Sequence, residues 1–260
     1  WESLVMLQRD IRDIFAKLDK RTRNKIRKAK SNGLVAVKDE TKNVNRLFQY
    51  VGKRDKKPLA FYREMVKNYG DDIDIYYAKI KTESYVINSR RNYEKEQEYN
   101  DNLAERIQDL DLDPKERENF LNKKMESDKL ITAYKNNLLK ATELLKERPE
   151  GIIVAGAMVI KYDNAAYIYT EGTDNSYSTI NPSYLLKWQL IEDYNQLGYK
   201  YVNLNAITGD FENKDPKRNP YIGLNDSKLG FNTTITEYIG EFDIVLNNFS
   251  YNLFKKVNKE

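Results

Sequence analysis

The sequence contains no cysteine and no histidine. Without cysteine the chain can form no disulfide bond, and an intracellular location becomes the default expectation. The two absences together exclude cysteine nucleophiles, Ser-His-Asp triads and zinc sites made of His and Cys. Any catalysis by this chain must therefore use Lys, Arg, Asp, Glu, Tyr or Ser side chains, backbone groups or the substrate itself.

Several other familiar signals are also absent. No apolar run approaches the roughly 20 residues that span a bilayer, and the N-terminus has no secretory signal pattern. There is no GxxxxGKS/T phosphate loop, no GxGxxG motif after a predicted strand, and no Arg/Gln-rich glycine turn of the kind that holds acetyl-CoA. Asp210, Glu212 and Asp215 lack the spacing of a calcium loop, which favours a solvated loop there. We expect neither a metal nor a cofactor.

The composition fits a protein with one real core and a long solvated element. Of the 260 residues, 40% are hydrophobic and 32% are charged. The net charge of +4 permits a polyanionic partner without demanding one. Tyr occurs 20 times; packing at sheet faces is the favoured interpretation, and stacking against a polar ligand is the alternative. The chain begins at Trp1 without an initiator Met, so we expect a fragment of a longer protein.

Residues 82–147 predict two long, charged helices with a break at residues 111–114, where Asp113-Pro114 suits a new helix start. Apolar residues recur there at spacings of three or four, which is the pattern of a heptad seam. The seam residues are Tyr99, Leu103, Ile107 and Leu110 on the first helix and Ile131, Tyr134, Leu138, Ala141 and Leu145 on the second. The hairpin would form an arm on the order of 40 Å long. We expect it to act as a lever, a spacer or a docking surface.

The sequence on both sides of the hairpin alternates between strand-like and helix-like segments. Residues 5–30 show the apolar stripe of a helix, with Asp19 or Thr22 as the cap of a second segment. Residues 41–69 also predict helix, with a break near Pro58. Further strands are predicted at residues 34–37, 73–80, 152–160, 165–170, 201–204 and 233–239, and further helices at residues 184–197, at residues 224–229 and at the C-terminus. This order predicts an α/β (α+β) fold.

A basic run lies within the first predicted helix. Its members are Arg21, Arg23, Lys25, Arg27, Lys28 and Lys30. A solvated helix face is the favoured interpretation of such a run. A phosphate-binding patch is the alternative, because closely spaced cations on one segment suit a polyanion.

Five segments resemble motifs of the FemABX peptidyltransferases, and together they cover essentially the whole chain. The matching segments are residues 181–188 (NPSYLLKW, similar to NPxxLLQW), 203–211 (NLNAITGDF, similar to GISGDF), 224–231 (LNDSKLGF, similar to YxFKxGFG), 237–243 (EYIGEFD, the same as the family's EYIGEFD) and 23–30 (RNKIRKAK, similar to RNxIRKA). One departure is Ser227, where the family motif usually has an aromatic residue before its Lys.

The resemblance implies an acetyltransferase-like (GNAT-type) mixed sheet with helices. Staphylococcal members of the family carry a helical hairpin within the second of two such domains, and the hairpin of this chain lies at the same place. We therefore expect a discontinuous domain of residues 1–82 and 149–260, interrupted by a coiled-coil arm of residues 83–148. The family's first domain would precede Trp1, which agrees with a fragment.

The resemblance also implies a reaction, the transfer of an aminoacyl group from aminoacyl-tRNA to an amine. In the family the donor is usually glycyl- or seryl-tRNA, and the acceptor is the stem peptide of a lipid-linked peptidoglycan precursor at the inner face of the membrane. The donor ester is already activated, so the protein has to position the reactants and stabilise the oxyanion. Homologous family members are further expected partners.

The family motifs assign roles to four residues of this chain. Lys228 matches the motif Lys, which implies stabilisation of the oxyanion; without the motif, a surface Lys would be the favoured interpretation. Tyr177 is expected to contact the sugar-peptide precursor, and Arg23 and Arg27 the phosphates of tRNA or of the precursor. Two alternatives stay open. One is a noncatalytic chain that binds tRNA or partner proteins through its arm, and the other is a CoA-dependent N-acetyltransferase, which rests on fold analogy alone.

Overall fold

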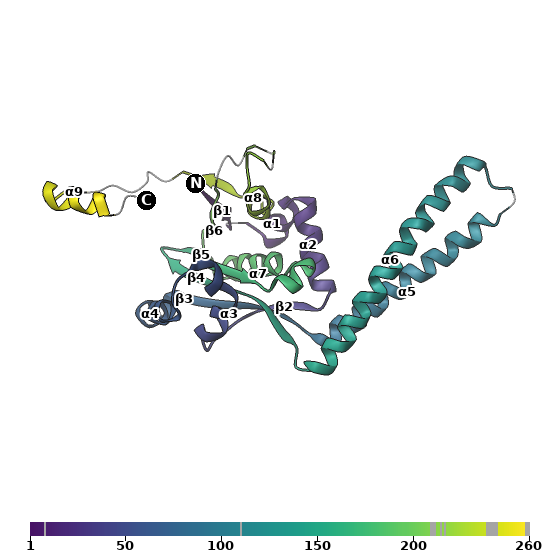
Figure 1. Cartoon of the computed structure of the whole chain (residues 1–260), viewed down its shortest axis with the longest axis horizontal. Helices are drawn as coiled ribbons and strands as arrows, with labels where there is room; N and C mark the ends of the chain where they lie inside the picture. The colour runs from purple at the N-terminus through teal and green to yellow at the C-terminus, as the bar shows by residue number, and fades with distance from the viewer. Residues whose placement is uncertain are drawn as a thin grey trace.

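A mixed sheet forms the centre of the α/β part of the chain (Figure 1). The computed structural model describes residues 1–7, 9–109, 111–208, 212–213, 215, 217–237 and 244–257. The described strands are β1 Glu2–Met6, β2 Leu34–Lys38, β3 Ile73–Ile80, β4 Ile152–Tyr162, β5 Ala165–Thr173, β6 Tyr201–Ala206 and β7 Thr234–Thr236. Their order is β2-β3-β4-β5-β6-β1-β7; β5 and β6 run parallel, and the other described neighbours run antiparallel. The predicted mixed α/β fold is confirmed.

Helices cover both faces of this sheet. The described helices are α1 Ile11–Lys17, α2 Lys20–Ser31, α3 Val44–Asp55, α4 Leu59–Tyr69, α5 Thr82–Ile107, α6 Pro114–Glu147, α7 Pro182–Gln196, α8 Ile222–Leu229 and α9 Asn248–Val257, with 3-10 helices η1 Gly70–Asp72 and η2 Asn175–Ile180. Neighbouring residues of a strand point to opposite faces. Tyr76 therefore packs in the core with α2 and α7, whereas Tyr77 packs in a second core with α3 and α4.

The N-terminal prediction is wrong in its first part. The sequence predicts a helix from Val5, but Val5 belongs to β1, which lies between β6 and β7. The spacing of the apolar residues alone does not separate a strand from the start of a helix. Val5 and Leu7 are buried, and the Leu7 N–H donates to the carbonyl of Lys200, far along the chain, at 2.9 Å. This pairing with a distant segment decides for the strand. The remainder forms two helices, α1 and α2, with Asp19 at the predicted N-cap position of α2. The predicted break near Pro58 is confirmed, because Pro58 separates α3 from α4.

The predicted hairpin is confirmed as two helices, α5 and α6, that pack against each other and project from the sheet (Figure 1). Asp113 caps α6, because its Oδ1 accepts the Lys115 N–H at 2.9 Å, and Pro114 occupies the first turn as predicted. At the root of the arm, Tyr85 and Ala141 are buried in the same core as α7. The root is thus continuous with that core, and the division of the chain into two domains stays a prediction.

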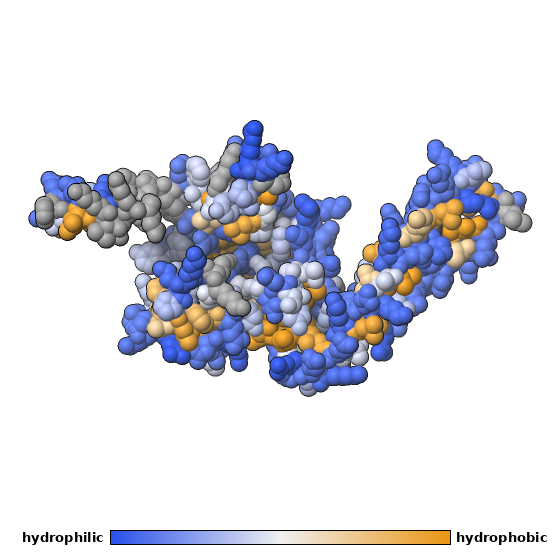
Figure 2. Space-filling model, viewed as in Figure 1, coloured by the Kyte–Doolittle hydropathy of each residue, from blue (hydrophilic) through white to orange (hydrophobic). Residues whose placement is uncertain are grey.

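Polar pairs contribute to the distal half of the arm, where the predicted apolar seam is partly wrong. Tyr99, a predicted seam residue, is 47% exposed, and Asn100 is buried instead. The Asn100 amide donates to Asp128 Oδ1 at 2.8 Å, and Ser127 Oγ donates to Glu96 Oε1 at 2.7 Å. The buried seam position is therefore one residue later than predicted. The buried Asn100 amide needs a hydrogen-bond partner, and Asp128 of the other helix supplies it. Hydrophilic residues cover much of the arm surface that Figure 2 shows.

The arm root depends on Gly151, whose φ of +90° lies in the left-handed region. A Cβ atom at this position would lie 2.4 Å from the Ile80 carbonyl oxygen, at the end of β3. Gly151→Ala should therefore lower the free energy of unfolding by more than about 1 kcal/mol, as measured by urea denaturation. Gly223→Ala is the matched control, because nothing lies within 4 Å of its Cβ position in α8. Equal losses in the two variants would contradict the strain at Gly151.

Candidate functional site

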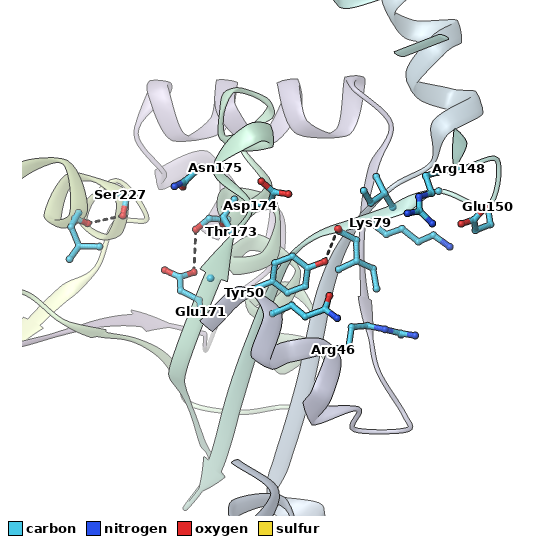
Figure 3. Close-up of a pocket in the computed structure, with 17 residues that line it drawn as sticks. Arg46, Tyr50, Lys79, Arg148, Glu150, Glu171, Thr173, Asp174, Asn175 and Ser227 are labelled. Atoms are coloured by element: carbon cyan, nitrogen blue, oxygen red, sulfur yellow. Dashed lines mark hydrogen bonds between the residues drawn. The ribbon is translucent and has the colours of Figure 1, made fainter. Parts of the chain in front are cut away.

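A cavity of about 1140 Å³ opens at the end of the sheet where β3 and β5 finish and β4 begins (Figure 3). Residues from α3, the arm root, η2, the first turn of α7 and α8 also line it. Gly172 of β5 lets α3 approach closely, because a Cβ atom there would lie 2.2 Å from the Tyr50 carbonyl oxygen. This approach places Arg46 and Tyr50, one helical turn apart, at the cavity wall.

One end of the cavity is cationic. Arg46 of α3, Lys79 of β3 and Arg148 at the arm root line it, and no ion pair joins any of the three to a carboxylate among the described residues. In Figure 3, Lys79, Arg148 and Glu150 lie at the arm-root side of the cavity. Tyr50 lies between this end and the rest of the cavity, and its hydroxyl donates to the Ile153 carbonyl at 2.8 Å. Unpaired guanidinium and ammonium groups in a concave site suit phosphate or carboxylate ligands.

The other end of the cavity carries carboxylates. Asp174 and Glu171 line it, and in Figure 3 Glu171 lies on the side of Ser227. Burial raises the pKa of Tyr50 above its ordinary value, and the nearby Asp174 carboxylate adds to this effect. Glu150 offsets part of the charge of the three cations at the arm-root end, which stays net positive, whereas the other end carries Glu171 and Asp174.

Glu171 is held by a lysine that is almost completely buried. Lys187 of α7 is 1% exposed, and its Nζ lies 2.5 Å from Glu171 Oε1 and 2.6 Å from Oε2. Lys187 Nζ also donates to Ser183 Oγ at 2.7 Å, and Ser183 Oγ donates to Glu171 Oε2 at 3.2 Å. A buried charge of this kind requires its partner, because an unpaired ion in the core is costly. The pair therefore fixes the carboxylate at the cavity wall.

Lys228, the predicted catalytic residue, lies on α8 at the border of this cavity. The preceding Ser227 lines the cavity, whereas Lys228 is 6% exposed and its Nζ donates to the Ala206 carbonyl at the end of β6. Asn225 fastens the same helix, because its side chain bonds the Thr208 carbonyl at 2.7 Å and the Thr208 N–H at 3.3 Å. The motif lysine is thus positioned next to the site, with its ammonium group turned towards the backbone.

The other predicted site residues do not line the cavity. Tyr177 lies on η2 and packs against the main core, and burial raises its pKa; its neighbours Asp174 and Asn175 reach the cavity instead. Arg23 donates to the Ala16 carbonyl at 2.6 Å, which satisfies an orphan group at the end of α1. Arg27 is exposed, and its guanidinium lies 5.4 Å from the centre of the Phe15 ring. The four predicted residues therefore do not form one cluster.

Parts of two predicted motifs lie outside the described residues, namely residues 209–211 and residues 238–243, as does the predicted seam residue Leu110. In the described part of the chain, no group of three acidic side chains could hold a metal ion. None of the described helices combines the length and apolar character needed to cross a bilayer.

Sequence reasoning missed most of the cavity wall. Arg46, Tyr50 and Arg148 belong to no motif, and the fold brings them together from segments about a hundred residues apart. Lys187 did carry a signal, because it is a charged residue between the apolar residues Leu186 and Trp188 of a predicted helix. Such a charge predicts a buried partner, although not which residue supplies it.

Comparison with known proteins places this geometry in a family. The model of the FemAB family matches residues 1–259. Aminoacyltransferase FemA of Staphylococcus epidermidis is 24% identical, over 98% of this chain and 61% of the relative. Lipid II:glycine glycyltransferase of the same species is 27% identical, over 94% of this chain and 58% of the relative. The chain thus spans about 60% of the length of these curated relatives.

A solved structure supports the same fold. The crystal structure of FemX superposes with a TM-score of 0.67 at 16% identity, over 98% of this chain and 63% of the FemX chain. The family model covers nearly the whole chain, which confirms the resemblance seen in the motifs. This chain belongs to the FemAB family.

Proposed function

We propose that this chain is an aminoacyltransferase of peptidoglycan bridge synthesis. It would move an amino acid, glycine or serine, from aminoacyl-tRNA to an amine of a precursor stem peptide or of the growing bridge. The observation that carries this proposal is a cavity with a cationic end, a carboxylate end and the motif helix α8 at its border. The names of the two staphylococcal relatives support the same reaction class.

The reaction needs little from the protein beyond geometry. The uncharged acceptor amine attacks the ester carbonyl of the charged tRNA, and a tetrahedral intermediate forms with a negatively charged oxygen. The ester C–O bond then breaks, and the ribose oxygen of the tRNA is the leaving group. This oxygen takes a proton from the attacking amine and becomes a ribose hydroxyl. In this proposal Lys228 supplies the cation that stabilises the oxyanion, after its side chain turns from the Ala206 carbonyl to the cavity.

The cationic end of the cavity suits the acceptor. A lipid-linked precursor carries a diphosphate, and Arg46, Lys79 and Arg148 offer the donors that such a group requires. The carboxylate end would then face the part of the precursor that carries the amine. Tyr177, behind the wall made by Asp174, would support this region rather than line it. A chain with these substrates would work at the inner face of the cell membrane, without spanning it, beside homologous family members.

The double variant Arg46→Gln/Arg148→Gln should raise the KM for the lipid-linked precursor at least tenfold, because two charge-assisted contacts to phosphate are lost; each is worth about 1.5–3 kcal/mol. The kcat at saturating precursor should change little. Steady-state kinetics with varied precursor measures both values. The control is Lys129→Gln/Lys135→Gln, which removes two exposed cations from α6 of the arm, neither of which lines the cavity. An unchanged KM in the cavity variant would show that the diphosphate does not bind at this end of the cavity.

A binding module is the second candidate function. The observation that favours it is the resting position of Lys228, whose ammonium group bonds the backbone instead of facing the cavity. Such a chain would hold tRNA or partner proteins through its arm without transferring anything. A single-turnover assay separates the two, because a binding module retains charged tRNA and leaves the precursor unmodified.

A further inference from the structure

One face of α2 carries a group of cations that the cavity does not use. We define the α2 basic surface as Lys20, Arg21, Arg27 and Lys28, all of which are exposed. At 3.6 residues per turn these positions share one side of the helix. The opposite side, with Thr22, Ile26 and Ala29, is buried against the body. The two sides of α2 are thus strictly separated into a core face and a basic face.

The charges on this surface are not compensated. Helix α2 contains no acidic residue. No ion pair joins Lys20, Arg21 or Lys28 to a carboxylate in the described part of the chain, and Arg27 rests on the Phe15 ring. In Figure 2 the edge of the body next to the arm, where Figure 1 places α2, is hydrophilic. Unpaired cations gathered on one helix face create a local positive potential that attracts polyanions.

Helix α2 adjoins the helix that carries Lys228 through its N-terminal end and its buried face. The Asp19 N–H, at the start of α2, donates to the Gly230 carbonyl at 3.0 Å, directly after α8. A Cβ atom at Gly230 would lie 2.2 Å from Thr22 Oγ1, so the two helices touch. Helix α2 also meets the first turn of α7, where Lys25 Nζ donates to the Tyr184 hydroxyl at 2.6 Å. Lys20 and Arg21 of the basic surface directly follow Asp19, so a polyanion along this surface would reach the end of α2 that contacts α8.

We propose that the α2 basic surface binds the phosphates of the acceptor stem of aminoacyl-tRNA and so directs its charged 3′ end to α8. This inference rests on the proposed function and adds the docking place of the donor. Lys20 and Arg27 are separated by seven residues, which is about 10 Å along the helix and spans more than one phosphate. A membrane surface is disfavoured, because an interfacial helix needs an apolar face towards the lipid, and the apolar face of α2 lies in the core.

The arm is a poorer place for RNA on its α5 side. Glu94, Glu98, Asp101 and Glu105 follow one another on the outer face of α5 and are exposed. Their spacing of three and four residues makes one continuous acidic stripe, and no ion pair joins these carboxylates to a described cation. This stripe would repel phosphates. The acidic stripe disfavours RNA on the α5 side of the arm, so the α2 basic surface is the stronger candidate and the cations of α6 serve as the control.

Binding of an RNA minihelix without an amino acid tests the proposal. The minihelix carries a tRNA acceptor stem with its single-stranded 3′ end, and its affinity for the chain is measured by fluorescence anisotropy at several salt concentrations. The test variant is Lys20→Gln/Arg21→Gln/Lys28→Gln. The matched control is Lys129→Gln/Lys135→Gln/Lys140→Gln, which removes three exposed cations from α6 of the arm. Both variants lower the net charge from +4 by three, and circular dichroism checks that both remain folded.

The proposal expects the α2 variant to weaken RNA binding at least tenfold and to reduce the slope of log K against log salt by about two to three. The arm variant should stay within twofold of the unchanged chain. Equal losses in the two variants, a larger loss in the arm variant, or no RNA binding by the unchanged chain would overturn it. It would also be overturned if the α2 variant kept its RNA affinity and lost binding to phosphatidylglycerol vesicles.

The failure of this proposal differs from the failure of the proposed reaction. The minihelix carries no amino acid, so its binding does not depend on transfer. If the chain binds the minihelix through α2 but transfers nothing, the proposed reaction is contradicted and the proposed RNA binding by the α2 basic surface is not. If the chain transfers normally from full-length tRNA after the α2 substitutions, only the proposed RNA binding by the α2 basic surface is contradicted.

Discussion

Lys228→Met should lower the rate of aminoacyl transfer by about 100- to 1000-fold, the range found when an oxyanion-stabilising donor is removed from an enzyme. Methionine keeps the length of the side chain but has no charge and no donor. The KM for the precursor should change little, because Lys228 does not line the cavity in its resting position. Single-turnover transfer from charged tRNA measures the rate.

Two controls separate chemistry from structure in this experiment. Asn225→Ala removes the hydrogen bonds that fasten α8 to Thr208 but keeps the ammonium group. Ser227→Ala removes a cavity-lining hydroxyl that bonds only the Leu224 carbonyl among the described residues. We expect Asn225→Ala to lower the thermal stability more than the rate, and Ser227→Ala to change neither greatly. If Asn225→Ala slowed transfer as much as Lys228→Met, the role of Lys228 would be to hold α8 in place.

Lys187→Met should have the largest effect on stability. It leaves the Glu171 carboxylate at the cavity wall without its buried partner, and breaking a buried pair in this way costs about 3–5 kcal/mol. The melting temperature should fall by about 10 °C in a chain of this size. Differential scanning calorimetry measures the melting temperature, and urea denaturation measures the free energy of unfolding.

The double variant Lys187→Met/Glu171→Gln shows whether the pair is responsible. It removes both charges, so at least half of the lost stability should return. The surface pair of Lys30 and Glu192, at 3.8 Å, provides a matched control. Lys30→Met should cost less than about 1 kcal/mol, because the Lys30 side chain is 51% exposed and water screens the pair. A double variant no more stable than Lys187→Met would show that Lys187 acts through packing instead of through its charge.

The sequence predicts those parts of the fold whose signals are local. The hairpin follows from heptad spacing and from Asp113-Pro114, which by itself caps a helix. The strand β1 was missed because its partners β6 and β7 lie about 200 residues later, and only this pairing distinguishes it from the start of a helix. The seam position of Asn100 was missed for a similar reason, since its partner Asp128 lies on the other helix.

The candidate site also contains some residues that the sequence predicts and others that it does not. Lys228 could be predicted because it lies within a motif, although its hydrogen bond to the Ala206 carbonyl could not. Arg46 and Arg148 could not be predicted, because each is an ordinary charged residue until the fold places both at one cavity. The basic run on α2 was predicted with two interpretations. The structure sorts its members, since Arg23 bonds the end of α1 and Lys30 pairs with Glu192, whereas Arg21 and Lys28 form no ion pair with a described carboxylate.

The most direct test of the proposed reaction is a single-turnover assay with tRNA charged with radiolabelled glycine or serine. The chain is mixed in excess with the charged tRNA and with lipid-linked precursor, and the label is followed into the lipid fraction. The proposal predicts that label enters the precursor as the aminoacyl ester disappears, and that Lys228→Met slows this appearance. An unlabelled precursor, with charged tRNA retained intact on the chain, would contradict it and would make the chain a binding module.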